Sequence, residues 1–284
     1  MIAFLGMGHL GANFVRAMLK RGEKVRVWNR TPSKAKALEE AGAEVFDRVE
    51  DAVEGVERIH LALKDDRSVN ELLQLACGSF QHGVIIVDHT TTSQKGAIDR
   101  AEYWRQNGCV YIHAPVFMGP QNALEGTGYM MVSGDKYTFS EIEKDLAKMT
   151  GKLMYMGKEP GKAAGMKLIG NLFLLAMTGG MADMLALSKA FGIAPDEIGK
   201  LLDMWNPGAM LPARFKRVSG GKYDDPTWEL HMARKDARLM VEGAEAADLT
   251  LATIPGLATL MDSYIARGHA NDDYSVVGLD YLPK

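Results

Sequence analysis

A glycine-rich segment, Gly6-Met7-Gly8-His9-Leu10-Gly11, lies between the apolar run Ile2–Leu5 and an amphipathic run, Leu10–Arg21. Each glycine of a G-x-G-x-x-G segment has its own use: the first permits a tight turn, the second lets the backbone approach a ligand, and the third lets a helix pack closely on a strand. The start of the helix also presents free N–H groups and a positive dipole end to an anion. Because a strand pattern precedes these glycines and a helix pattern follows them, we predict that this segment binds the pyrophosphate of a dinucleotide.

The same alternation of short apolar runs and amphipathic runs continues through the first half of the chain. We predict strands at Ile2–Leu5, Val25–Trp28, Ile59–Leu63, Val84–Asp88 and Val110–Val116, and helices at Leu10–Arg21 and Ser33–Ala41. This order predicts an α/β fold with a doubly wound, mainly parallel sheet of the Rossmann type. We expect two further strands, Tyr129–Gly134 and Leu153–Met156, to complete or edge that sheet.

The alternation stops after Met156, where Gly157–Gly165 combines glycines and small residues with a proline, as domain boundaries often do. We therefore predict a dinucleotide-binding domain over 1–160 and an all-α domain over 161–284, which carries the substrate and dimerisation functions. A long interdomain helix is expected from about Lys162 to Phe191. Because it is apolar around most of its girth, we expect both domains and a partner subunit to cover it, in a homodimer or homotetramer.

Composition and charge exclude several classes of partner. The 284 residues are 47% hydrophobic, and 33 basic against 36 acidic side chains give a net charge of -3. No long basic run suggests nucleic acid, and polar residues interrupt the apolar stretch Leu168–Leu187, so we expect no membrane span. Cys77 and Cys109 form no CxxC or Cys/His cluster, and no residues have metal-ligand spacing, so we expect no metal. The N-terminus lacks the basic segment of a signal peptide, and we expect a cytoplasmic protein.

The end of the second predicted strand carries Asn29, Arg30 and Thr31. A chain that binds NAD usually places Asp or Glu here to hold the ribose 2′-hydroxyl, and this chain has no acidic residue at that point. Arg30 can instead offer its planar guanidinium to a 2′-phosphate, with Asn29 and Thr31 as supporting donors. The sequence therefore favours NADP(H) as the cofactor.

Lys167 and Asn171 are four residues apart near the start of the long predicted helix, and so share one helix face. A lysine and an amide that point into a cleft between domains would make an acid and a substrate anchor. Spacing alone leaves open the alternative that Lys167 is an ordinary surface lysine.

Six segments in order carry a resemblance that covers essentially the whole chain: FLGMGHLGANFVRAMLKRG, the NRT after the second strand, DHTTTS (Asp88–Ser93), HAPVFMGPQNALEGTG (His113–Gly128), GKAAGMKLIGN (Gly161–Asn171) and MARKDARL (Met232–Leu239). With them the chain resembles the β-hydroxyacid dehydrogenase family, the group of 3-hydroxyisobutyrate dehydrogenase and glyoxylate/succinic semialdehyde reductase. The resemblance implies an NADP(H)-dependent oxidoreductase that transfers a hydride between the nicotinamide and a carbonyl or hydroxyl carbon.

The resemblance also implies roles for single residues. Lys167 would protonate the carbonyl oxygen, or take the alcohol proton in reverse, and Asn171 would hold the substrate or orient the lysine. The cofactor would be contacted by Leu63, Thr91 and Lys235 in addition to the glycine segment, and the substrate would face Phe117, Met118 and Gly119.

One departure from the family pattern bears on the substrate. In the family the Ala-Pro-Val run is usually followed by Ser-Gly-Gly or Ser-Gly-Ser, whose hydroxyl and N–H groups grip a substrate carboxylate, whereas this chain has Phe117-Met118-Gly119. The change favours a larger or less polar carbonyl compound over a small hydroxy acid. Two alternatives remain: an NADPH-dependent imine reductase, although those enzymes usually carry Asp or Tyr in place of Lys167, and a nonenzymatic NADP-binding protein, although such relatives lose the lysine.

Overall fold

The computed structural model describes residues 1–283 and consists of two compact units, one from Met1 to Asn171 and one from Leu172 onward. A six-stranded sheet forms the centre of the first unit, in the order β3-β2-β1-β4-β5-β6. All of its strand pairs are parallel: β1 (Ile2–Leu5), β2 (Val25–Trp28), β3 (Glu44–Val45), β4 (Arg58–Leu61), β5 (Ile85–Asp88) and β6 (Val110–His113). The predicted Rossmann-type sheet is confirmed.

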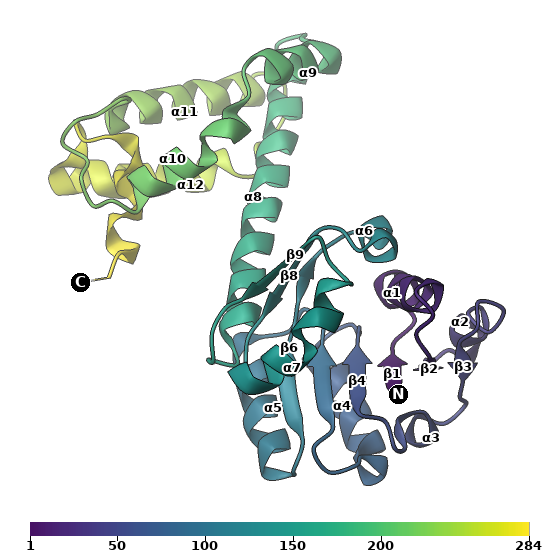
Figure 1. The fold of residues 1–284 in the computed structure, drawn as a ribbon. Helices are drawn as coiled ribbons and strands as arrows, with labels where there is room; N and C mark the ends of the chain where they lie inside the picture. The colour runs from purple at the N-terminus through teal and green to yellow at the C-terminus, as the bar shows by residue number, and fades with distance from the viewer. Residues whose placement is uncertain (284) are drawn as a thin grey trace. The chain divides into compact units, whose positions relative to one another are not determined.

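Helices cover both faces of this sheet (Figure 1): α1 (His9–Lys20), α2 (Pro32–Lys36), α3 (Val49–Val53), α4 (Asp66–Ala76) and α5 (Gln94–Gln106), with a short 3-10 turn η1 (Cys77–Ser79) after α4. Alternate residues of β1 point to opposite faces, so Phe4 belongs to one apolar core while Ala3 and Leu5 belong to the other. Where both faces are buried, as along most of β1 and β5, the strand reads as a nearly continuous apolar run. The strand order reverses between β1 and β4, the point where open α/β sheets bind ligands at their carboxyl edge.

A separate three-stranded sheet follows, and the prediction that its strands complete or edge the large sheet was wrong. β7 (Val116–Phe117) pairs antiparallel with β8 (Tyr129–Val132), which pairs parallel with β9 (Lys152–Tyr155). Two helices, α6 (Pro120–Glu125) and α7 (Lys136–Ala147), complete this part. The run Val110–Val116 is therefore two strands in two sheets, because Pro115 has no N–H to continue the first ladder. The segments near residues 129 and 153 join the smaller sheet and do not extend the large one.

The second unit is helical, as predicted. Its helices are most of α8 (Lys162–Ala190), α9 (Pro195–Met204), α10 (Leu211–Val218), α11 (Leu230–Glu245) and α12 (Ile254–Tyr264), with short turns η2 (Pro207–Met210), η3 (Ile265–His269) and η4 (Tyr274–Tyr281). A small core built around Leu230, Met261 and Tyr264 joins α11, α12 and η4. The units divide within α8, whereas the sequence places the domain boundary before Gly161.

Helix α8 has the predicted length, from Lys162 to Ala190. Its first turns are buried in the first unit at Ala163 and Ala164, but many apolar side chains farther along are exposed in the single chain. By length and composition alone α8 could cross a membrane, a test that core helices of soluble proteins also pass. Asp183 argues for a packed helix, because its buried carboxylate accepts hydrogen bonds from the backbone N–H groups of Ala252, Thr253 and Ile254, at the start of α12.

Candidate cofactor and catalytic site

The three glycines after β1 meet three different constraints. Gly6 has φ +100°, and a Cβ there would lie 2.4 Å from the carbonyl oxygen of Ala62. A Cβ on Gly11 would lie 2.0 Å from the carbonyl oxygen of Gly6, so α1 approaches the turn as closely as backbone allows. A Cβ on Gly8 would meet nothing within 4 Å, which leaves bare backbone beside open space. This is the arrangement that a pyrophosphate needs.

A cavity of about 280 Å³ lies at this turn, against the N-terminal end of α1. Gly8 precedes α1 without any side-chain cap, and the first turn carries no acidic residue, so its N–H groups and dipole favour an anion. The cavity is lined by Gly8, His9, Leu10, Gly11, Ala62, Leu63, Lys64, His89, Thr90 and Thr91. The glycine turn thus lies beside the loops after β4 and β5, and the residues present fit a dinucleotide.

Six of the predicted cofactor residues line this cavity: Gly8, His9, Leu10, Gly11, Leu63 and Thr91. Gly6 and Met7 support it from behind, since Met7 is buried in the core and its N–H donates to the Asn29 side chain at 2.8 Å. Sequence reasoning did not select Ala62, Lys64 or Thr90 as cofactor residues. Their only signal was position: Ala62 lies inside the predicted strand Ile59–Leu63, and Lys64 and Thr90 come within two residues of the ends of predicted strands. A second cavity, of about 340 Å³, lies between α4 and α5 and shares no residue with this one.

The end of β2 carries Asn29, Arg30 and Thr31 beside the glycine turn. The Asn29 carboxamide is already engaged, because it accepts from Met7 and donates to the Thr31 carbonyl oxygen at 2.9 Å. It therefore fixes the turn, with one N–H left for a ligand. Arg30 is exposed and has no hydrogen-bond or ion-pair partner among residues 1–283, so its guanidinium is free to bind a phosphate.

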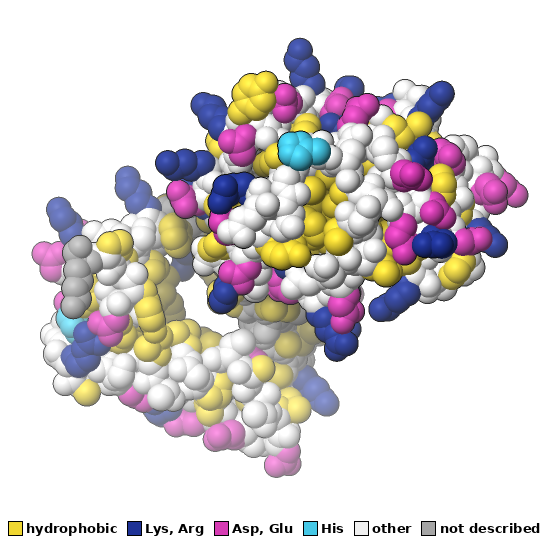
Figure 2. Space-filling view, turned by 90° about the horizontal axis from the view of Figure 1, so that it is seen from below, with side chains coloured by type: hydrophobic (Ala, Val, Ile, Leu, Met, Phe, Trp, Pro, Cys, Tyr) yellow, Lys and Arg dark blue, Asp and Glu magenta, His cyan; other side chains and the backbone are white. Residues whose placement is uncertain are grey.

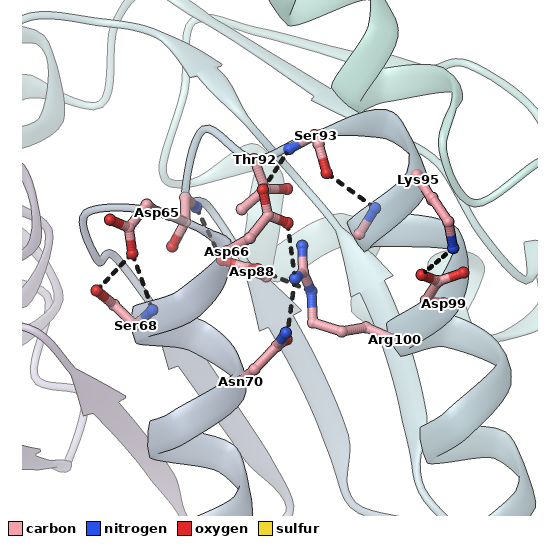
Figure 3. Close-up of polar contacts among 12 residues, drawn as sticks. Asp65, Asp66, Ser68, Asn70, Asp88, Thr92, Ser93, Lys95, Asp99 and Arg100 are labelled. Atoms are coloured by element: carbon pink, nitrogen blue, oxygen red, sulfur yellow. Dashed lines mark hydrogen bonds and ion pairs between the residues drawn. The ribbon is translucent and has the colours of Figure 1, made fainter.

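A buried polar network fixes the two loops that form the opposite wall of the cavity (Figure 3). Asp88, at the end of β5, accepts from the Thr90 N–H at 2.9 Å and from the Tyr111 hydroxyl at 2.6 Å. Thr90 in turn accepts from the Leu63 N–H at 3.0 Å. The loops after β4 and β5 are thereby joined directly behind the predicted contacts Leu63 and Thr91.

Arg100 of α5 extends this network. Its guanidinium donates to the Tyr111 hydroxyl at 2.9 Å. It also donates to Asp66 at 2.9 Å, and Asp66 accepts from the Ser93 N–H at 2.8 Å (Figure 3). Burial and the Asp88 carboxylate raise the pKa of Tyr111 well above its usual value, so this hydroxyl stays protonated. The network holds the start of α4 and the start of α5 in register.

Three buried histidines lie at this cavity or bond to residues that line it. Nδ1 of His60 and Nε2 of His89 share a hydrogen bond of 2.9 Å, and His113 hydrogen-bonds the Thr90 carbonyl oxygen at 3.0 Å. Burial lowers the pKa of His89 to about 4 and lowers those of His60 and His113, so all three are neutral at pH 7. His89 was not favoured as a cofactor residue by its sequence position, yet it lines the cavity. Within residues 1–283 no three His, Cys, Asp or Glu side chains are grouped as metal ligands, and the absence of a metal stays a prediction.

Lys167 lies in the second turn of α8 and is only 9% exposed, which removes the surface-lysine alternative. Burial lowers the pKa of its ammonium group. Its amine lies 4.0 Å from the centre of the Phe117 ring, which brings two predicted site residues together. Asn171, one turn later, is half-buried.

The remaining predicted site residues are Met118, Gly119 and Lys235. Met118 packs against the core of the first unit, and the Gly119 N–H donates to the Asn122 side chain at 2.9 Å. Lys235 belongs to α11 in the second unit, where its amine pairs with Asp236 at 2.8 Å. Its contact with the cofactor stays a prediction.

A family model described as the NAD binding domain of 6-phosphogluconate dehydrogenase matches residues 1–157. The chain belongs to this family. The matched part ends close to the predicted domain boundary and contains the glycine turn, the cavity and the polar network.

Curated relatives support the same conclusion. Glyoxylate/succinic semialdehyde reductase 2 of Arabidopsis thaliana is 27% identical over 97% of this chain and 78% of its own length. The cytokine-like nuclear factor N-PAC of Drosophila melanogaster is 29% identical over 87% of this chain, but the chain spans only 42% of that protein. The resemblance to β-hydroxyacid dehydrogenases is confirmed.

Solved structures confirm the fold over nearly the full chain. An imine reductase from Myxococcus stipitatus in complex with NADP+ has a TM-score of 0.92, with 20% identity over 98% of both chains. The second unit therefore belongs to the shared fold as much as the first. The matched family model supports a nicotinamide cofactor for this chain.

Proposed function

We propose that this protein is an NADP(H)-dependent oxidoreductase that reduces a carbonyl compound, or oxidises the corresponding alcohol, with Lys167 as the group that gives or takes the proton. The observation that carries the proposal is the Lys167 side chain, which is only 9% exposed, has no hydrogen-bond acceptor within the first unit and belongs to the same unit as the dinucleotide cavity. A buried lysine without a hydrogen-bond acceptor or a carboxylate partner is costly to keep, and functional sites are where such groups occur.

Each step of the proposed reaction can be assigned to the bound cofactor or to a residue of this chain. Bound NADPH would supply the hydride to the carbonyl carbon. Lys167 would place its proton on the carbonyl oxygen, and its lowered pKa makes the amine a better proton donor than free lysine. Asn171 would anchor the substrate, while the turn at Gly8 and the N–H groups of α1 would hold the pyrophosphate.

Preference for NADPH over NADH is proposed from Arg30, which is exposed and unpaired among the described residues. A cytoplasmic location and the absence of nucleic-acid and membrane partners are also proposed. Lys/Arg and Asp/Glu side chains are interspersed on the face in Figure 2, without one basic area, which agrees with the net charge of -3.

The direct test replaces Lys167 with Ala. Loss of the proton donor should lower kcat for carbonyl reduction by about 10²- to 10⁴-fold, while the Kd for NADPH, from fluorescence titration, stays unchanged. Lys162→Ala, an exposed lysine at the start of the same helix, is the matched control and should keep full activity. Equal kcat in the Lys167→Ala variant and the wild type would contradict the proposal.

Imine reduction is the second candidate, because the Phe117 ring beside Lys167 offers an apolar site rather than a carboxylate-binding one. Turnover of a cyclic imine with NADPH, measured beside succinic semialdehyde and glyoxylate, separates the two reactions. NADPH binding without turnover of any of these compounds would favour the nonenzymatic alternative.

A further inference from the structure

The Lys167 ammonium has an aromatic ring where a buried cation usually has a carboxylate. Its nitrogen lies 4.0 Å from the centre of the Phe117 ring, well within the range of a cation–π interaction. Within the first unit, no carboxylate, amide or carbonyl oxygen accepts a hydrogen bond from this amine. Burial alone lowers the pKa of Lys167, and no neighbouring charge counteracts it.

The ring is held in this position from two sides. Phe117 pairs with Tyr129 in the smaller sheet, which fixes its backbone. On the other side the ring lies against Gly170, three residues after Lys167 on the same face of α8, where a Cβ would come 2.3 Å from the ring. Gly170 is therefore the residue that makes room for Phe117 over the lysine.

The segment from Val116 to Gly119 offers few hydrogen-bond donors to an anionic group of a substrate. Residues Val116 to Gly119 contain no hydroxyl, and the Gly119 N–H already donates to Asn122 at 2.9 Å. Met118 packs inward against the core. A carboxylate beside Lys167 would have to lie against the electron-rich face of Phe117 and lose its hydration without these donors.

We propose that Phe117 is a positioning and specificity-determining residue, whose ring holds the Lys167 ammonium and makes the wall beside it apolar, so that the preferred carbonyl compound carries an uncharged, apolar group there. This inference rests on the proposed oxidoreductase function. The ring stabilises the charged lysine without offering an oxygen that could take its proton. The substrate carbonyl oxygen is then the acceptor that completes the site.

The test compares succinic semialdehyde with its ethyl ester, which has the same aldehyde but no charge. The wild type should favour the ester in kcat/KM by at least about tenfold, the scale of one charged hydrogen bond. Phe117→Ser should shift the ratio toward the acid by a similar factor. Phe117→Leu should keep the preference for the ester, because it keeps an apolar wall. A wild type that favours the acid, or a ratio unchanged in Phe117→Ser, would overturn the specificity role.

A second readout tests the positioning role without turnover. The Lys167 amine is titrated by 15N NMR in the NADPH-bound wild type and in Phe117→Leu. Phe117→Leu keeps an apolar side chain but removes the π-face, and this should lower the pKa of Lys167, because its charged form loses the cation–π partner that it has in the first unit. An unchanged pKa would overturn that role. If the wild type reduced neither aldehyde, the proposed function would fail, and the NMR comparison would still decide whether the ring holds the ammonium.

Discussion

Arg30 is the residue on which coenzyme preference depends. It is exposed at the end of β2, and Asn29 beside it is occupied in holding Met7 and Thr31, so the guanidinium is the main candidate to bind a 2′-phosphate. One hydrogen bond to a charged group corresponds to about ten- to hundredfold in affinity. A single side chain can therefore account for most of the preference of this site for NADPH over NADH.

Replacing Arg30 with Ala should raise the Kd for NADPH by about ten- to hundredfold and leave that for NADH nearly unchanged. Both constants can be measured by fluorescence titration at one fixed ionic strength, because phosphate contacts weaken with salt. Arg105→Ala on α5, also an exposed arginine, should alter neither constant. Equal losses for the two coenzymes would show that Arg30 does not contact the 2′-phosphate.

Among single residues, the sequence predicts the role of those that belong to a local sequence pattern. Gly6, Gly8 and Gly11 are determined by spacing between a strand and a helix. Lys64 and Thr90 have no such pattern, because they enter the cavity only when β4 and β5 become neighbours in the sheet. The contact of Lys167 with Phe117 likewise joins residues of two sequence segments that no periodicity relates.

Among the elements, the loops after β4 and β5 depend on Arg100 of α5. Arg100 is 4% exposed and bonds Asp66 and Tyr111, and Tyr111 in turn bonds the fully buried Asp88. Removal of one partner from a buried charged network leaves the others without compensation, a cost of about 3–5 kcal/mol.

Arg100→Leu should therefore lower the free energy of unfolding by about 3–5 kcal/mol, measured by urea denaturation with and without NADPH. Arg105→Leu is the matched control on the same helix. Its pair with Glu102 is exposed, and the change should stay within about 0.5 kcal/mol. Equal effects of the two substitutions would contradict a structural role for the buried network.

The elements themselves differ in how far the sequence predicts them. Apolar runs bounded by polar segments predict β1 and β2 to the residue, and β4 and β5 to within two residues at each end, because most side chains of these strands are buried. The two-residue β3 is too short to show a pattern. The division of Val110–Val116 between two sheets required Pro115 to be recognised as the end of one ladder, and the pairing of β7 with β8 is not encoded locally.

At the scale of the whole molecule, α8 carries more apolar surface than one chain covers. Leu172 is 69% exposed and Leu175 is 73% exposed, and Ile169, Leu174 and Leu185 are each at least 46% exposed. Contiguous apolar patches of this kind mark association sites in soluble proteins. The sequence predicts that other parts of the protein cover α8. We propose that a second copy of the chain covers the apolar side chains that are exposed in one chain.

The paired substitution Leu172→Glu and Leu175→Glu should convert a homodimer or homotetramer to a monomer of 31.1 kDa, measured by light scattering after size-exclusion chromatography. The reason is that two carboxylates would have to lose their hydration in an apolar interface. Tyr137→Glu on α7, also 73% exposed, controls for added surface charge and should leave the assembly intact. A wild type that is already monomeric would contradict self-association through α8. A double variant that keeps the wild-type mass would place the interface elsewhere.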